Sequence, residues 1–226
     1  QCSEVVGKVT AQAAEATGLA PGTPVLGGTV DASAAMLEAG VIDNCEAVEM
    51  TGTSSGLLMG FDRFCYTPNM AHQFASVPGA HITYGSMNST GACYKWFKEE
   101  LYDKGGRDNV SYREMDEEIL RDSPEPTKII FHPYMMGERC PIWNSSARGT
   151  FIGMDLSTSR ADLMRAVLEG VGYALRDNME EAKQAGMSIS QVYTVGGCSN
   201  SMLWNEIKAS ILNVPFSIPA SSKGAV

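Results

Sequence analysis

Three short glycine-bearing turns hold the residues of this sequence that are best suited to chemistry on phosphate. They lie at residues 27–31, 52–55 and 196–200, and each follows a short apolar run typical of a strand. A helical pattern follows the third turn, so free backbone N–H groups and the positive end of a helix can attract an anion there. A lone glycine turn commonly only reverses the chain, but three of them, two beside Ser, Thr or Asn, favour phosphate binding.

The best-known phosphate motifs are not completed by these turns. No Gly-Lys-Ser or Gly-Lys-Thr occurs anywhere in the chain, and neither Gly27-Gly28 nor Gly196-Gly197 extends to Gly-x-Gly-x-x-Gly. The sequence therefore disfavours a P-loop enzyme and a dinucleotide-binding fold.

Asp31 is the carboxylate on these turns, at the start of a predicted helix. Aspartate often caps the first turn of a helix, so one interpretation is structural. The other is chemical, because a carboxylate beside a phosphate site can accept the proton of a substrate hydroxyl. Phosphoryl transfer to an alcohol needs such a base, with donors and a metal around the moving phosphate. The local sequence leaves both interpretations open.

Other reactive side chains give weaker signals. The histidines, His72, His81 and His132, have no Cys or carboxylate spacing around them that indicates a metal site. Arg139 lies in a long loop and can pair either with a phosphate or with the neighbouring Glu138.

Hydrophobic periodicity and turn residues predict the elements that must hold these turns. Helices are expected over residues 3–17, 31–39, 88–101, 111–121, 159–185 and 201–212, and strands over 25–26, 46–50, 56–59, 72–77, 81–85, 128–131, 191–195 and 214–218. Ser159 and Asp162 form a candidate capping box for the longest helix. Strand pairs mixed with long amphipathic helices predict an α/β domain with a mixed sheet flanked by helices.

Composition sets the class of protein. The 226 residues are 44% hydrophobic and 19% charged, which is typical of a globular chain. Seventeen basic against 26 acidic residues give a net charge of −9, without a Lys/Arg block, so neither a nucleic-acid backbone nor an anionic membrane surface is an expected partner. No apolar run reaches the ~18 residues of a membrane span, and the first thirty residues lack a signal-peptide pattern.

The cysteines and the chain ends add two expectations. The six cysteines are widely spaced without a Cys-x-x-Cys pair, which favours reduced thiols in a cytoplasmic protein. The chain begins at Gln1 and stops directly after a strand-like segment, so we expect a piece of a longer protein.

Taken in order, several segments resemble the C-terminal half of the FGGY carbohydrate kinases, most closely the xylulokinase-like branch. They are Gly22-Thr23-Pro24-Val25 with Gly27-Gly28 and Asp31; Thr51-Gly52-Thr53-Ser54; Asn88-Ser89-Thr90-Gly91 before Trp96; Gly137-Glu138-Arg139 with Ala147-Arg148-Gly149; Asp162-Leu163 with Ala166-Val167-Leu168-Glu169; and Gly196-Gly197 through Ser201, Trp204 and Asn205. The likeness spans nearly the whole chain.

The resemblance implies the actin-like, ribonuclease H-like ATPase fold, with residues 1–226 as the nucleotide-binding lobe of a two-lobed kinase. It implies ATP-dependent phosphorylation of a sugar hydroxyl, most closely that of D-xylulose or a related ketose, with ATP and Mg²⁺ as cofactors and Asp31 as general base. The implied nucleotide-binding residues are Gly52, Thr53, Ser54, Gly91, Gly196, Gly197, Asn200 and Ser201. No metal ligand is assigned.

The resemblance also implies what lies outside this chain. An N-terminal lobe would carry a further phosphate loop and most sugar contacts, with residues 1–24 as the junction, so the chain alone is expected to be inactive. Many relatives dimerise, so a homodimer is an expected partner state. Ala32 and Lys95 depart from the polar uncharged residues of some relatives, which leaves the sugar open.

Two alternatives stay open at this point. One is a nucleotide-binding or regulatory module of the actin-like ATPase class that transfers nothing to a sugar. The other is a structural α/β domain whose glycine turns bind no ligand.

Overall fold

The computed structural model describes residues 2–41, 45–107 and 109–219. The strands are β1 (Val5–Lys8), β2 (Pro24–Leu26), β3 (Glu46–Thr51), β4 (Ser55–Phe61), β5 (Ala71–Phe74), β6 (His81–Met87), β7 (Ile130–His132), β8 (Thr150–Ile152), β9 (Gln191–Val195) and β10 (Phe216–Ser217). The α-helices are α1 (Ala11–Thr17), α2 (Asp31–Glu38), α3 (Gly91–Phe97), α4 (Tyr112–Asp122), α5 (Arg160–Gln184) and α6 (Met202–Leu212). A π-helical turn, η1 (Lys98–Asp103), extends α3, and a 3₁₀ turn, η2 (Gly197–Asn200), precedes α6.

A six-stranded mixed sheet forms the centre of the molecule, in the order β10-β9-β3-β4-β6-β5. Strands β10, β9 and β3 run parallel, whereas β4, β6 and β5 each lie antiparallel to their neighbours. The register pairs Thr51 with Ser55, Ser55 with Met87, and Met50 with Val195. The ends of β3, β6 and β9 therefore meet at one edge of the sheet, so the segments that follow them are neighbours there.

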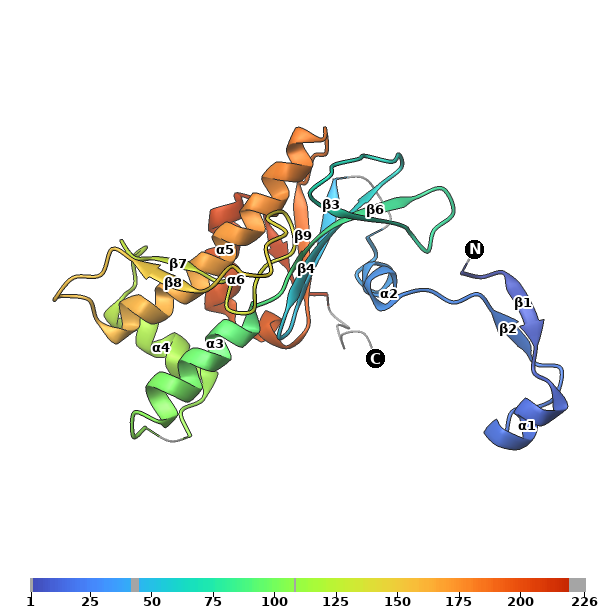
Figure 1. Ribbon diagram of the computed structural model, residues 1–226, viewed down its shortest axis with the longest axis horizontal. Coiled ribbons are helices and arrows are strands. Elements are labelled where there is room, and N and C mark those ends of the chain that lie inside the picture. The colour runs from blue at the N-terminus through green and yellow to red at the C-terminus, as the bar shows by residue number, and fades with distance from the viewer. Residues whose placement is uncertain (1, 42–44, 108, 220–226) are drawn as a thin grey trace.

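Each face of the sheet is covered by its own helices, as Figure 1 shows. Because side chains alternate along a strand, Ala47, Leu57 and Met59 face the core beneath α5 and α6. Their neighbours Val48 and Leu58 face the opposite cluster, which includes residues of α2. The predicted mixed sheet with flanking helices is confirmed, and α2 lies on the face opposite α5.

The longest helix supplies much of the larger core. The capping box forms as predicted, since the Ser159 hydroxyl accepts from the Asp162 N–H and the Asp162 carboxylate accepts from the Ser159 N–H. Val167, Val171, Leu175 and Met179 recur every four residues along one side of α5 and are fully buried, while Leu163 at the start of this row is partly buried. Gly170 lets α5 approach β7 closely, because a Cβ there would collide with the Phe131 carbonyl. No helix in the part of the chain that the structure describes is long and apolar enough to cross a membrane.

The predicted helix over residues 3–17 is wrong in its first half. Val5–Lys8 forms a strand that pairs with β2, and the helix begins only after Thr10, whose hydroxyl accepts from the Ala13 N–H. Apolar residues of β1 and α1 happen to follow one helical spacing, so the two elements were predicted as a single helix. No side chain of β1, β2 or α1 is buried, and in Figure 1 these elements project away from the rest of the molecule.

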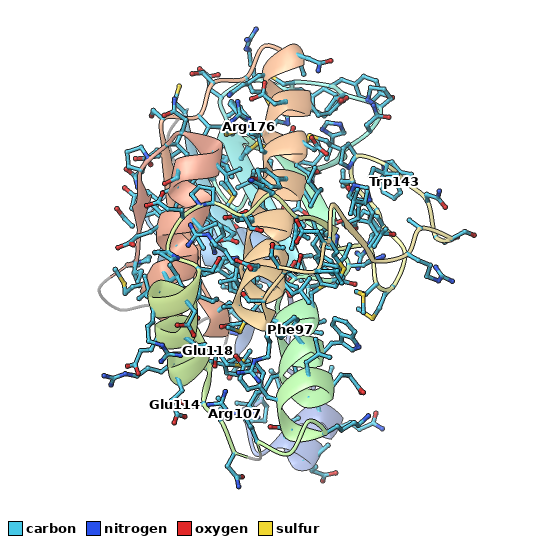
Figure 2. All side chains as sticks on the ribbon, turned by 90° about the vertical axis from the view of Figure 1, so that its left-hand side faces the viewer. Phe97, Arg107, Glu114, Glu118, Trp143 and Arg176 are labelled. Carbon is cyan, nitrogen blue, oxygen red and sulfur yellow. The ribbon has the colours of Figure 1, made fainter. Side chains whose placement is uncertain are left out.

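The long loop between β7 and β8 packs beside the sheet edge, and β8 itself is a strand that the sequence did not reveal. Loop residue Glu138 is buried, and one of its carboxylate oxygens accepts from the N–H groups of Asn88 and Arg139. Figure 2 shows Trp143 on this loop, away from Glu118, and its indole N–H donates to the Asn69 carbonyl at 2.8 Å.

Candidate functional site

A cavity of about 770 Å³ opens at the sheet edge where β3, β6 and β9 end. Its lining residues are Gly52, Thr53, Gly91, Ala92, Tyr94, Lys95, Tyr112, Arg113, Asp116, Glu117, Leu120, Gly197, Cys198, Asn200, Ser201, Met202, Leu203 and Trp204. The volume falls in the range of small-molecule sites. Two of the three glycine turns, which are far apart in the sequence, therefore share one cavity.

The turn after β3 is held firmly against the start of α3. The Gly52 carbonyl accepts from the Gly91 N–H at 3.0 Å, and the Thr53 carbonyl accepts from Thr90 and Ala92. Among the described residues, the backbone N–H groups of Thr53 and Ser54 donate to no protein acceptor. The turn is thus fixed in place with two donors available to an anion.

Two of the predicted glycines act by close packing. A Cβ on Gly91 would collide with the Gly52 carbonyl and would lie 2.8 Å from the Cys198 sulfur. Gly196 has φ +97°, and a Cβ there would lie 2.5 Å from the Thr51 carbonyl oxygen. Only glycine lets these segments approach the β3 turn so closely.

Gly197 differs from these two, because a Cβ on it would meet no atom within 4 Å. Its backbone lines the cavity openly. The Asn200 side-chain amide donates to the Gly197 carbonyl at 3.0 Å, and this hydrogen bond between the two ends of η2 stabilises the turn. A ligand can therefore approach the backbone of Gly197 directly.

The structure thus brings together most of the predicted nucleotide-binding residues. Gly52, Thr53, Gly91, Gly197, Asn200 and Ser201 all line the cavity. Ser54 and Gly196 adjoin the cavity-lining residues in the chain but are absent from the lining itself.

Asp31 is not part of this lining. It is the first residue of α2, and the N-cap is Val30, which makes no side-chain cap bond. The capping interpretation of Asp31 is therefore wrong. Its exposed carboxylate accepts only locally among the described bonds, from the Ala32 N–H at 2.7 Å.

The turn after β3 also contains a sequence pattern that is typical of serine hydrolases. Residues 52–56 read Gly-Thr-Ser-Ser-Gly, which fits the Gly-x-Ser-x-Gly pattern of hydrolase nucleophiles. That chemistry needs a sharp turn from a strand into a helix, whereas this turn joins the antiparallel strands β3 and β4. The context of Ser54 therefore does not support a serine hydrolase.

The outer wall of the cavity comes from α4, and sequence reasoning missed it. Asp116 of α4 accepts hydrogen bonds from the Tyr94 and Ser201 hydroxyls, each at 2.7 Å. Burial raises the pKa of Asp116, while these two hydroxyls act to lower it. The same burial, together with the Asp116 charge, raises the pKa of Tyr94. The charged pattern of residues 111–121 indicated a surface helix and hid this inward carboxylate.

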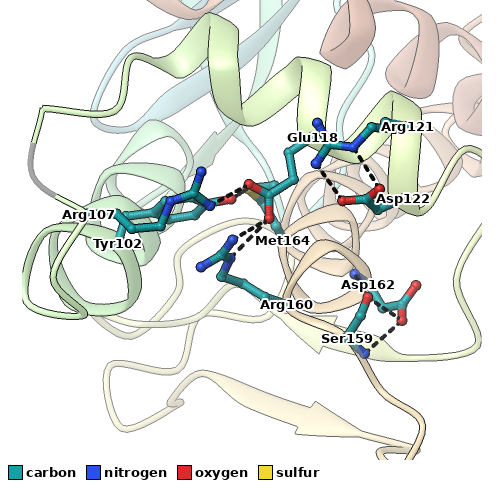
Figure 3. Close-up of polar contacts among 9 residues, drawn as sticks. All are labelled: Tyr102, Arg107, Glu118, Arg121, Asp122, Ser159, Arg160, Asp162 and Met164. Atoms are coloured by element: carbon teal, nitrogen blue, oxygen red, sulfur yellow. Dashed lines mark hydrogen bonds and ion pairs between the residues drawn. The ribbon is translucent and has the colours of Figure 1, made fainter.

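A cluster of charges fixes α4 in position (Figure 3). Glu118 is buried, and its carboxylate accepts from Arg160 at 2.6 Å and from Arg107 at 3.1 Å. Burial acts to raise the pKa of Glu118, but the hydrogen bonds from Arg160, Tyr102 and Arg107 and the Arg160 charge hold it below its ordinary value. The guanidinium of Arg160 also lies 4.3 Å from the Tyr102 ring centroid. These contacts join the cavity wall to α5.

A fully buried ion pair joins β3 to α6. Lys208 of α6 donates to Glu49 of β3 at 2.5 Å, and Thr194 of β9 donates to the same carboxylate oxygen at 2.9 Å. Lys208 also lies 5.4 Å from the Trp204 ring centroid. The pair connects the strand that carries the β3 turn to the helix that begins at Ser201.

Two further features bear on cofactors. Within residues 2–41, 45–107 and 109–219, no group of three His, Cys, Asp or Glu side chains is placed to hold a metal ion. The six cysteines are free thiols, of which Cys65, Cys93 and Cys140 are buried.

Comparisons with known proteins agree with this geometry. Residues 47–226 match the model of the FGGY family of carbohydrate kinases, C-terminal domain. The chain is 32% identical over 211 residues to the xylulose kinase of Escherichia coli and 30% identical over 211 residues to that of Staphylococcus epidermidis. Each match covers 92% of this chain and 42% of the relative, so the chain spans about two fifths of their length.

The solved structures give the same result. The crystal structure of xylulose kinase from Rhodospirillum rubrum superposes with a TM-score of 0.85 at 28% identity, covering 95% of this chain and 43% of that one. The predicted fold, one lobe of an actin-like ATPase, is confirmed. The chain belongs to the FGGY family of carbohydrate kinases.

Proposed function

We propose that this chain is the nucleotide-binding lobe of an ATP-dependent sugar kinase that phosphorylates a hydroxyl of D-xylulose or a related ketose. The observation that carries the proposal is the convergence of the β3 turn, the start of α3 and the η2 turn on one cavity. The two relatives named above are xylulose kinases, which favours that sugar class.

The residues of the cavity fit a nucleotide. The phosphates would lie on the turn of Gly52, Thr53 and Ser54, where the N–H groups of Thr53 and Ser54 have no internal acceptor among the described residues. Gly91 and Gly196 would shape this turn by close packing, and the open backbone of Gly197 would take the base, with Asn200 and Ser201 beside it.

ATP would supply the transferred phosphoryl group, and Mg²⁺ would neutralise charge on it. Mg²⁺ usually keeps several waters and binds through substrate phosphates with one or two carboxylates. Mg²⁺ bound in this way needs few protein ligands, so it is compatible with described residues that form no group of three His, Cys, Asp or Glu side chains. The role of the chain's own residues is to position the phosphates and to exclude water from them.

Asp31 would be the general base that accepts the proton of the sugar hydroxyl. Its carboxylate is exposed and is engaged only by its neighbour's N–H among the described bonds, so it is available to a substrate. In-line phosphoryl transfer needs no further reactive side chain, because positioning and charge stabilisation provide most of the catalysis.

A second lobe is the expected partner of this chain. The relatives are more than twice as long, and Val5, Val6, Val25 and Leu26 of the N-terminal hairpin expose about half of their apolar surface. We propose residues 1–24 as the junction with that lobe, which would bind the sugar. The chain alone would then be inactive. A homodimer and a cytoplasmic location, the latter fitting six free thiols, are part of the same proposal.

The alternative is a nucleotide-binding module of the actin-like class that transfers no phosphate to a sugar. A panel of ketoses, sugar alcohols and sugar acids with the full-length protein, followed by ADP release, separates the two. Turnover with D-xylulose or a close relative supports the kinase, and ATP binding without turnover on any sugar supports the module.

Asp31→Asn in the full-length protein tests the assignment of the base. We expect turnover to fall by at least about 10²-fold, the usual contribution of a general base, with ATP affinity unchanged. Glu38→Gln, a carboxylate change at the other end of α2, is the control and should keep its turnover. Retained turnover in Asp31→Asn would remove Asp31 from this role.

A further inference from the structure

The long loop of residues 133–149 packs along the segment that enters α3. The Met136 N–H donates to the Ser89 hydroxyl at 3.2 Å. The Cys93 thiol, in the first turn of α3, donates to the Pro133 carbonyl at 3.4 Å. The loop and the start of α3 are therefore held together at more than one point.

Glu138 makes the central contact between these two segments. Its Oε1 atom accepts from the Asn88 N–H at 2.9 Å and from the Arg139 N–H at 2.7 Å. The Arg139 guanidinium in turn donates to the Asn88 amide oxygen at 2.7 Å. The backbone of Glu138 is itself fixed, because it exchanges hydrogen bonds with the backbone of Asn144 at 2.8 and 2.9 Å. The carboxylate thus reaches from a fixed backbone to the residue that directly follows β6.

The burial of this carboxylate is unfavourable for stability alone. Glu138 is only 3% exposed, and its second oxygen, Oε2, has no hydrogen-bond partner among the described residues. Burial raises the pKa of Glu138, which shows that the charged form is penalised there. A buried carboxylate with one unpaired oxygen adds little to the free energy of unfolding. The contact is better suited to fixing the position of Asn88.

The residues that follow Asn88 hold the turn after β3. The Thr90 N–H donates to the Thr53 carbonyl, and the Gly91 N–H donates to the Gly52 carbonyl, each at 3.0 Å. Gly91 packs so closely that a Cβ on it would collide with the Gly52 carbonyl. A shift of the segment at Asn88 must therefore move the turn.

We propose that Glu138 is a positioning residue for the phosphates of a bound nucleotide. The proposal rests on the proposed nucleotide site. Glu138 fixes Asn88, and the segment after Asn88 holds the N–H groups of Thr53 and Ser54 where an anion can meet them. Glu138 is absent from the cavity lining, so it acts through these residues and not by contact with the ligand. Its effect should fall on the phosphates and spare the nucleoside.

Equilibrium binding of ADP and of adenosine to the full-length protein tests this role. Adenosine lacks the phosphates, so the ratio of the two dissociation constants reports on the turn. We expect the wild type to prefer ADP. Glu138→Ala should reduce that preference by at least about fivefold, the lower end of the usual coupling between two sites, with the affinity for adenosine unchanged.

Two conservative variants separate the reach of the side chain from its charge. Glu138→Gln keeps the length and one oxygen that can accept both N–H groups, and should keep the wild-type ratio. Glu138→Asp keeps the charge but is one CH₂ shorter, and should lower the ratio. This pair decides the question even if Glu138→Ala does not fold. Glu125→Ala, an exposed change outside the cavity lining, is the control and should match the wild type.

The outcomes separate the two proposals. A wild type that binds neither ligand, or binds ADP no more tightly than adenosine, contradicts the proposed nucleotide site. A folded Glu138→Asp variant with the wild-type ratio overturns the role of Glu138 and leaves that site intact. An equal loss of affinity for both ligands also overturns it, because a merely structural residue would act in that way. So does a Glu138→Gln variant that lowers the ratio as far as Glu138→Asp, because the two accepted hydrogen bonds would then not position the turn.

Discussion

Gly91 and Gly197 line the same cavity for different physical reasons. Gly91 is needed because a side chain would strike the Gly52 carbonyl, whereas the space beside Gly197 is open. A glycine that packs against protein and a glycine that leaves room for a ligand should respond differently to the same change.

A pair of alanine substitutions separates these roles. Gly91→Ala should lower the free energy of unfolding by roughly 2 kcal/mol, because the β3 turn must move, and should weaken ATP binding as well. Gly197→Ala should leave thermal stability near wild type and weaken only ATP binding. Calorimetric melting and nucleotide titration on both variants measure the two effects. Equal stabilities would show that the close approach at Gly91 is unimportant.

The buried pair of Glu49 and Lys208 gives a second prediction at this scale. Lys208→Met should destabilise the protein by about 3–5 kcal/mol, because Glu49 would be left as a buried charge. The double variant Glu49→Leu with Lys208→Met should recover most of that loss, since no charge then remains. Urea unfolding of the single and double variants gives the coupling. Additive losses would contradict the pairing.

At the scale of elements, α4 depends on Glu118 to remain the wall of the cavity. Glu118→Gln weakens the hydrogen bonds from Arg107 and Arg160, and we expect a loss of about 1.5–3 kcal/mol at neutral pH. Glu117→Gln, one residue away but exposed and paired with the exposed Arg113, should cost less than about 0.5 kcal/mol. Urea unfolding at pH 7 compares the two.

The same residue gives a pH dependence with a defined sign. The pKa of Glu118 is lower in the folded protein than its ordinary value, so its contribution is complete above that ordinary value, about 4.3. It is lost as the pH falls through the lower, folded pKa. The difference in stability between wild type and Glu118→Gln should therefore shrink on acidification below about pH 4. A difference that stays constant to lower pH would contradict the shift.

At the scale of the whole molecule, the N-terminal hairpin of β1 and β2 lacks a protein surface to pack against. Its strands and α1 bury no side chain here, and Val5, Val6, Val25 and Leu26 remain exposed. A two-stranded sheet without a packed face is marginal in water. Its stability should come from the remainder of the longer protein.

Hydrogen exchange compares the hairpin in two settings. In residues 1–226 alone, the amides of β1 and β2 should exchange rapidly, and in the full-length protein they should be strongly protected. The amides of α5, whose core side chains are buried within this chain, should be protected in both and serve as the internal control. Rapid exchange of β1 and β2 in the full-length protein would contradict the proposed junction.

Local patterns in the sequence were sufficient for much of the fold. The apolar spacing and capping box of α5 are local, and so are the short apolar runs of β3 and β4, because they follow from the order of side chains along one element. The helix predicted over residues 3–17 failed because β1 draws its stability from pairing with β2, which lies sixteen residues further on and is invisible to a local pattern.

The sequence by itself determined the family, the sheet class and the glycine turns, since each depends on residues near one another in the chain. Only the tertiary structure decided which turns share a cavity, because that depends on the parallel register of β3 and β9. It also revealed Asp116, whose partners Tyr94 and Ser201 lie 22 and 85 residues away in the chain. A carboxylate on a charged helix shows its direction only when the helix has packed, because burial and partners belong to the fold.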